Sequence, residues 1–246
     1  MKVQTAAKIL SPIIFFLLWY LLALLINSPL ILPYPHIVIT RLYFLAQTKI
    51  FWLAFAITSL RVFSAFLISL ILGFFTGLLS ADFPFVKALI SFPLQVIRAT
   101  PLVAFILITL FWFTSGKVPV FVAIIMSLPV VISSSEKGFE KNPQNQEKLF
   151  KAACYGFTGF KAFCYIRFPA ALPSLFAGAE SAFGLCWKVV AAGEVLSIPR
   201  YGAGSLMQHS QIHLETADTL ALTLTIIMFS IICGYIFHSV IKLLTN

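Results

Sequence analysis

Long apolar runs, separated by shorter polar stretches, dominate the sequence and predict helices that cross a membrane. A helix needs about 20 mostly apolar residues to span the hydrocarbon core of a bilayer. About six runs approach this length, and the third is interrupted by Pro93 and Pro101. The pattern therefore predicts an all-α polytopic membrane protein. The expected spans cover residues 9–26, 62–80 with an extension back to about 51, 102–114, 118–134, 174–196 and 220–243.

The first apolar run has a charged start and an apolar centre, which is also typical of a secretory signal peptide. Its length, and the lack of a small-residue cleavage pattern after Ile26, favour a retained helix. A proline-rich stretch at 28–35 and a mixed stretch at 36–49 follow. We expect these to form an external loop and then a helix that lies at the membrane interface.

Composition agrees with burial in lipid. The 246 residues are 60% hydrophobic and only 10% charged, with a mean hydropathy of +1.00. A soluble domain carries about 25% charged residues, so most of this surface must face lipid. The cysteines show no CxxC or metal-type spacing, and we expect free thiols. They are Cys154, Cys164, Cys186 and Cys233.

The basic residues give the expected orientation. A net charge of +9 in a soluble protein would suggest a nucleic-acid partner. Here the basic residues lie between apolar runs, so the membrane explains them and no nucleic acid is expected. With six spans, the N-terminus, loop 81–98, loop 135–170 and the C-terminus share one side, which holds eleven basic residues against five. The positive-inside rule then places both termini and loop 135–170 in the cytoplasm.

The segment from 136 to 167 is the one long polar stretch, and it is also rich in aromatic residues. Such a density of exposed apolar groups suggests a docking surface for another protein. An amphipathic helix on the inner leaflet is the alternative, and the residues alone leave both open. We expect one helix over 146–155, ended by Gly156, and a second that begins near Thr158 and ends at Pro169.

The spacing within this segment resembles the coupling motif of binding-protein-dependent ABC importer permeases. That motif reads Glu-Ala-Ala, three residues, Gly, nine residues, Ile, one residue, Leu-Pro. With Gly156 as the motif glycine, the isoleucine falls at Ile166 and the proline at Pro169. Ala152 matches as well.

The sequence departs from the motif at three positions and matches the family elsewhere. Phe150 replaces the glutamate, Lys151 the first alanine and Phe168 the leucine. The likeness to the nitrate/sulfonate/bicarbonate (taurine) type of permease covers about residues 50–245. Its further motifs are Ser59-Leu60-Arg61, the glycines of the second span, Arg98-Ala-Thr-Pro101, Trp187-Lys-Val-Val-Ala-Ala-Gly-Glu194 and Tyr201-Gly-Ala-Gly204.

The resemblance implies a type I importer permease. Residues 1–50 would hold the N-terminal helix, external loop and interfacial helix, and residues 51–245 the permease domain with a coupling loop at 135–173. The implied ATPase-coupling residues are Ala152, Ala153, Tyr155, Gly156, Phe157, Phe160, Ile166 and Pro169.

The resemblance also implies partners. Two permease copies would pair in the bacterial inner membrane, bind a cytoplasmic ABC ATPase dimer and receive solute from an external binding protein or lipoprotein. No GxxxxGK[ST] phosphate-binding motif occurs in the sequence. ATP and Mg²⁺ would therefore be held by the ATPase, and this chain would not be an enzyme. The implied substrate is a small anion or polar solute: a sulfonate, nitrate, bicarbonate or vitamin precursor.

The fifth span carries ionisable residues, which are expensive in a bilayer and usually face protein or water. We interpret Glu180, Trp187, Lys188 and Glu194 as candidates for the substrate pathway. The alternatives are a structural pair with another helix, or Lys188 reaching outward to the interface. For Glu194 we expect a contact between helices or subunits.

Other features have simpler interpretations. Gly73 and Gly77 form a GxxxG pattern, which we interpret as helix packing. His209 and His213 suit an interfacial position better than a metal site. A self-contained secondary transporter or channel is the alternative function, but it predicts matching charged or broken helices in both halves. A membrane enzyme would need a cluster of reactive side chains, which the sequence lacks.

Overall fold

The computed structural model describes residues 2–140 and 159–245, and the backbone over these ranges is helical without strands. This confirms the all-α prediction. The helices are α1 Lys2–Ile26, α2 Pro35–Ala46, α3 Lys49–Asp82, α4 Pro84–Ala99, α5 Leu102–Thr109, α6 Val118–Phe139, α8 Gly159–Ala162, the π-helix η1 Phe163–Arg167, α9 Phe168–Ser197, α10 Ala203–Ile212 and α11 Thr216–Thr245.

Four of these helical segments are long and apolar enough to cross a membrane: α3, α6, α11 and the continuous segment Gly159–Ser197. The pair α4 and α5 passes the same test together, with a bend of 101° between the two helices. The remaining predicted run, the first in the chain, is α1, whose apolar part Leu10–Ile26 is shorter than the four spanning segments. Each predicted apolar run therefore contains a helix, although the third run is only partly helical.

The third run differs from its prediction. Residues 81–98 were expected to be a loop, but most of them form α4, which begins with Pro84 in its first turn, where a proline is tolerated. The span expected at 102–114 ends at Thr109. The bend lies at Thr100, which is extended (ψ 126°) because a residue before proline avoids the helical region. Arg98, counted among the cytoplasmic loop residues, therefore lies in a helix.

The prediction of a helix end at Pro169 is also wrong. The chain runs as one helical segment from Gly159 to Ser197. The Phe168 N–H donates to the Phe163 carbonyl, five residues back, which is the hydrogen bond of a π-helix. This wider turn directly precedes Pro169, whose ring would clash with the preceding turn of a regular helix interior. The helix therefore continues through the proline.

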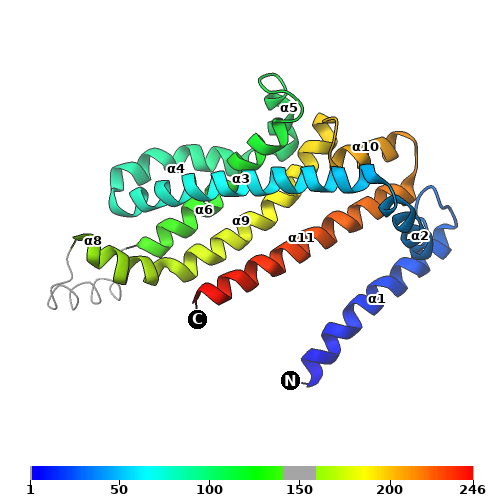
Figure 1. Cartoon of the computed structure of the whole chain (residues 1–246), viewed down its shortest axis with the longest axis horizontal. Coiled ribbons are helices and arrows are strands. Elements are labelled where there is room, and N and C mark those ends of the chain that lie inside the picture. Colours follow the sequence, from blue (N-terminus) through cyan, green and yellow to red (C-terminus); the bar gives the residue numbers. More distant parts are fainter. Residues whose placement is uncertain (1, 141–158, 246) are drawn as a thin grey trace.

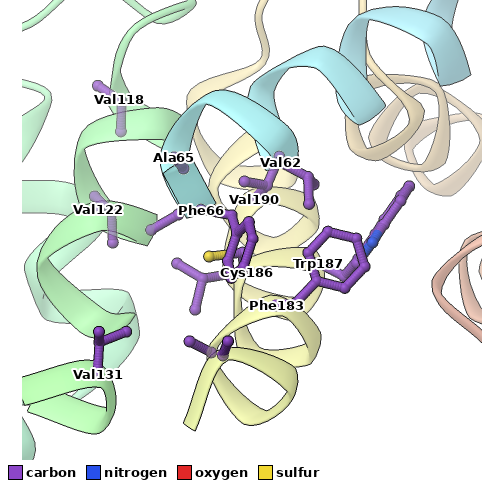
Figure 2. Close-up of a cluster of buried hydrophobic side chains, with 14 of the residues drawn as sticks. Val62, Ala65, Phe66, Val118, Val122, Val131, Phe183, Cys186, Trp187 and Val190 are labelled. Carbon is purple, nitrogen blue, oxygen red and sulfur yellow. The ribbon is translucent and has the colours of Figure 1, made fainter. Parts of the chain in front are cut away.

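The core lies where α3, α6 and α9 pack together (Figure 1). Val62 and Phe66 of α3 meet Phe183 and Trp187 of α9 in the buried cluster of Figure 2. Small residues allow this close packing. A Cβ built on Gly73 would lie 2.6 Å from the Val131 side chain of α6.

Two more glycines have the same role. A Cβ on Gly77 would lie 2.7 Å from the Ile132 carbonyl oxygen, and one on Gly178 of α9 would overlap Ser134 of α6. The packing interpretation of the GxxxG pattern is thus confirmed for α3 against α6.

The N-terminal part lies at the edge of the bundle. Figure 1 shows α1 pointing away from the other helices, and most of its described side chains are exposed. The helix expected at 36–49 is α2, and Arg41 of α2 forms a two-point ion pair with buried Asp218 of α11. Three of the four cysteines, Cys164, Cys186 and Cys233, are free, and Cys154 lies outside the described residues.

Candidate coupling and pathway sites

The bundle has two ends, and each carries a network of polar contacts. We call the end where α3 and α6 finish and α9 begins the Asp82 end. We call the opposite end, where α9 finishes and residues 198–202 lead into α10, the Tyr201 end. The segment expected to meet an ATPase leads into the Asp82 end.

Five of the predicted coupling residues lie outside the described residues: Ala152, Ala153, Tyr155, Gly156 and Phe157. The structure places the other three. Phe160 lies on α8 with 80% of its surface exposed. Ile166 is half-buried in the π-helix and Pro169 is exposed in the first turn of α9.

An arginine and an aspartate join three elements at the Asp82 end. Arg167 of η1 donates from Nη1 and Nη2 to the Asp82 carboxylate of α3, at 2.8 and 2.7 Å. The same Nη2 donates to the Phe139 carbonyl of α6 at 3.0 Å, and the guanidinium lies 5.5 Å from the centre of the Phe139 ring. A planar guanidinium suits such two-point binding of a carboxylate. The beginning of the long helix is therefore tied to the ends of both neighbours.

A second set of contacts surrounds this pair. Glu136 of α6 accepts a hydrogen bond from Ser80 of α3 at 2.9 Å and forms an ion pair with Lys87 of α4 at 2.6 Å. These contacts add α4 to the same end. Neither Asp82 nor Lys87 was among the predicted site residues.

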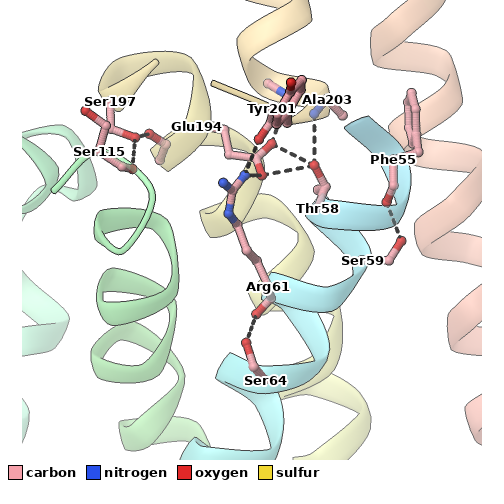
Figure 3. Close-up of polar contacts among 12 residues, drawn as sticks. Phe55, Thr58, Ser59, Arg61, Ser64, Ser115, Glu194, Ser197, Tyr201 and Ala203 are labelled. Atoms are coloured by element: carbon pink, nitrogen blue, oxygen red, sulfur yellow. Dashed lines mark hydrogen bonds and ion pairs between the residues drawn. The ribbon is translucent and has the colours of Figure 1, made fainter. Parts of the chain in front are cut away.

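The Tyr201 end is built around the fully buried carboxylate of Glu194 on α9 (Figure 3). Arg61 Nη1 of α3 donates to Glu194 Oε1 at 2.5 Å, and the Thr58 hydroxyl donates to Oε2 at 2.8 Å. The Gly204 N–H of α10 donates to Oε2 at 3.0 Å. Burial of a charge is tolerable when it is paired and hydrogen-bonded in this way.

The segment after α9 closes over this carboxylate. The Tyr201 carbonyl accepts from Arg61 Nη1 at 2.7 Å, and the Ala203 N–H donates to the Thr58 hydroxyl at 2.8 Å. A Cβ on Gly202 would lie 2.6 Å from the carboxylate carbon of Glu194. The contact between helices expected for Glu194 is present, and its partners on α3 were not predicted.

The four predicted pathway residues do not come together. Glu194 is enclosed at the Tyr201 end, and Trp187 is buried in the core. The Glu180 carboxylate is hydrogen-bonded to His238 Nδ1 of α11 at 2.5 Å. Lys188 is exposed and has no hydrogen-bond or ion-pair partner among the residues that the structure describes.

One face of α9 is uncovered. Ala177, Ser181 and Lys188 are exposed, and Gly184 and Val195 are half-buried. Their spacing of three, four and seven residues places them on one side of the helix. A Cβ on Gly184 would meet no atom within 4 Å. This uncovered face of α9 carries a lysine among small side chains.

The described residues around His209 and His213 do not form a metal site. His209 and His213 are both exposed, and within the described ranges no three His, Cys, Asp or Glu residues gather closely enough to hold a metal ion.

Comparison with known proteins decides the family. Residues 69–246 match the model of the binding-protein-dependent transport system inner membrane component. The chain belongs to this family. It is a multi-pass inner membrane protein and a non-enzymatic transport component of the ABC importer permease type.

Named relatives agree with this. The taurine transport system permease protein TauC of Escherichia coli K12 is 24% identical over 82% of this chain and 75% of its own length. A putative ABC transporter permease of Methanocaldococcus jannaschii is 27% identical over 84% of this chain and 79% of its own. The putative aliphatic sulfonates transport permease protein SsuC of E. coli K12 is 27% identical over 77% and 71%.

Proposed function

We propose that two copies of this permease form the membrane pathway of an importer for small organic anions such as sulfonates. A separate cytoplasmic ABC ATPase dimer holds ATP and Mg²⁺, and an external binding protein delivers the solute. The observation that carries the coupling part is the unbroken helical segment Gly159–Ser197, which leads from the coupling loop into the bundle core. The sulfonate class comes from the names of two relatives, the taurine and aliphatic sulfonates permeases.

The contacts at the Asp82 end provide a route for the coupling movement. A displacement of the coupling loop reaches α8 and the π-helix first, because these elements follow it directly in the chain. Arg167 is bonded to Asp82 of α3 and to the Phe139 carbonyl of α6. The three core helices therefore receive the displacement together.

The uncovered face of α9 is the part of the core that we assign to the pathway. A lysine inside a membrane span usually faces water or protein, and Lys188 is exposed with no hydrogen-bond or ion-pair partner in the described part of one copy. Small side chains around it leave room for solute and for a second copy to approach.

The Asp82 end faces the cytoplasm in this proposal, as do both termini. The asymmetry of basic residues supports this orientation, and removing Arg98 from the cytoplasmic count leaves it in place. The ATPase then meets the same end as the Arg167–Asp82 pair.

Substitution of the motif glycine tests the function. Gly156→Asp places a charge and a side chain in the coupling segment. We expect the variant to insert into the membrane but to lose uptake that depends on ATP in proteoliposomes containing the ATPase and the binding protein. Gly116→Ser, in an exposed loop before α6, is the control and should import normally. Normal complex assembly and normal uptake by Gly156→Asp would refute the coupling assignment.

A further inference from the structure

Arg98 of α4 is an exposed charged residue that has no acidic partner among the residues that the structure describes. It lies in the last turn of α4, and its Nη2 donates to the Ser133 hydroxyl at 2.5 Å and to the Pro129 carbonyl at 3.2 Å. Both acceptors belong to α6. Ser133 precedes the last residue of α6 by six positions, or about 9 Å along the helix. The guanidinium therefore contacts α6 well within its length.

No acidic side chain of the described residues neutralises the charge of Arg98. Among the described residues, no carboxylate lies within ion-pair distance of it. A guanidinium has five N–H donors, and the two contacts to α6 use neutral acceptors. Charged residues inside membrane spans pair with one another, with backbone carbonyls or with water and solutes. Arg98 thus keeps donors and an uncompensated positive charge available for a ligand.

Arg98 forms part of the wall of a cavity of about 520 Å³ between α4, α5, α6 and α9. The polar groups in the wall are Arg98, Thr100, Ser133 and Ser134, and no acidic residue lines it. The remaining wall is apolar and includes Leu102, Met126, Val130, Leu185 and Val189. The Thr100 hydroxyl donates to the Val96 carbonyl at 2.7 Å, whereas the Ser133 hydroxyl accepts from Arg98 and keeps its own proton for an anion. One cation, serine hydroxyls and an apolar surface suit a solute with an anionic head and a short apolar body.

A second cation lies beside this cavity. Lys188 follows Leu185 by three residues on α9, which places the two about 60° apart around the helix. Leu185 lines the cavity, while Lys188 is on the adjoining uncovered face. An anion that moves from the cavity along the uncovered face of α9 would therefore leave Arg98 and approach Lys188.

We propose that Arg98, with the Ser133 hydroxyl, binds the oxyanion head of the transported solute in this cavity. A planar guanidinium matches the oxygens of a sulfonate or a similar head group. This inference rests on the proposed importer function and names a specificity-determining residue for it. A lipid phosphate offers the same chemistry, so the experiment has to separate the two sources.

Chemical modification measures binding directly. In a background whose native cysteines are replaced, Val130→Cys places a thiol in the cavity wall. We expect an anionic thiosulfonate reagent to react with it faster than a cationic reagent of the same size. We also expect ethanesulfonate to slow this reaction. Adding Arg98→Gln should reduce both the preference and the protection about tenfold or more, because hydrogen bonds to charged groups are lost. Arg200→Gln is the control at the Tyr201 end.

Uptake separates this inference from the proposed function. In proteoliposomes with the ATPase and binding protein, Arg98→Gln should assemble and hydrolyse ATP but import about tenfold less, and Arg98→Lys should import more than Arg98→Gln. Unchanged uptake by Arg98→Gln would overturn the proposal. If the parent chain itself fails to import, the proposed function fails, and the protection assay still decides on anion binding.

Varying the lipid composition tests whether the site binds a lipid head group instead of a solute. The protection by ethanesulfonate should be the same in phosphatidylcholine liposomes with and without phosphatidylglycerol. Protection that comes from phosphatidylglycerol alone, with no effect of ethanesulfonate, would assign the site to a lipid head group and overturn a solute site.

Discussion

The two ends of the bundle use the same chemical contact, an arginine on a carboxylate, in different surroundings. At the Tyr201 end the Glu194 side chain is 0% exposed and its partner Arg61 is 13% exposed. At the Asp82 end the Asp82 side chain is 27% exposed and Arg167 is 16% exposed. Both pairs join α3 to the long helical segment that contains α9, but only the first is closed off from solvent.

The difference in burial indicates different roles. Opening the Glu194 pair would leave a buried charge without a partner, which is strongly unfavourable. Water reaches the Asp82 pair more easily, so its contacts can be exchanged for hydration at a smaller free-energy cost. We infer that the Tyr201 end fixes the fold of the core, whereas the Asp82 end transmits movement from the coupling loop.

The largest expected effect is on folding at the Tyr201 end. Glu194→Ala leaves the charge of Arg61 unpaired and the Gly204 N–H without its acceptor. We expect a loss of about 3–5 kcal/mol in the free energy of unfolding. Thermal unfolding of the detergent-purified protein measures this. Glu180→Ala on the same helix removes a half-exposed pair with His238 and should cost about 1 kcal/mol or less. Equal losses would remove the distinction between enclosed and accessible pairs.

A methyl group at Gly202 should have a smaller effect on the same end. It would lie 2.6 Å from the Glu194 carboxylate carbon, so the turn or the carboxylate must shift. Overpacking of this kind costs about 1–3 kcal/mol. The matched control is Gly184→Ala, where the added methyl meets no atom within 4 Å. If both variants unfold at the same temperature, the turn does not pack on Glu194 as described.

The smallest effect is expected at Lys87. Its side chain is 58% exposed, and its partner Glu136 keeps the hydrogen bond from Ser80. Lys87→Met should change the free energy of unfolding by less than about 1 kcal/mol, and the difference should shrink at high salt. Unfolding curves at low and high salt test this. A larger loss that salt does not affect would show that the Asp82 end is as rigid as the other.

Much of the fold was predictable because the long spans are apolar along nearly their whole length, whether a side chain faces the core or the lipid. The segments corresponding to α3, α6, α9 and α11 stood out for this reason. The helix α4 did not, because Lys87, Gln95 and Arg98 interrupt its apolar pattern. Continuation of the helix through Pro169 depends on a π-helical turn, which no local pattern indicated.

The sites were predictable only in part. The resemblance to the family indicated a contact between helices or subunits for Glu194, but its partner Arg61 lies 133 residues earlier. Asp82 and Arg167 are 85 residues apart and were assigned to separate loops. One sequence gives no information about such distant pairs. The assignment of Lys188 to the pathway stays a prediction.

The ratio of solute imported to ATP hydrolysed tests the central claim most directly. It is to be measured in proteoliposomes for Asp82→Arg, Arg167→Asp and the double variant that exchanges the two charges. We predict that each single variant hydrolyses ATP with its partner but imports little, and that the exchange restores much of the ratio. Single variants with the normal ratio, or an exchange no better than either single change, would contradict a coupling role for the Asp82 end.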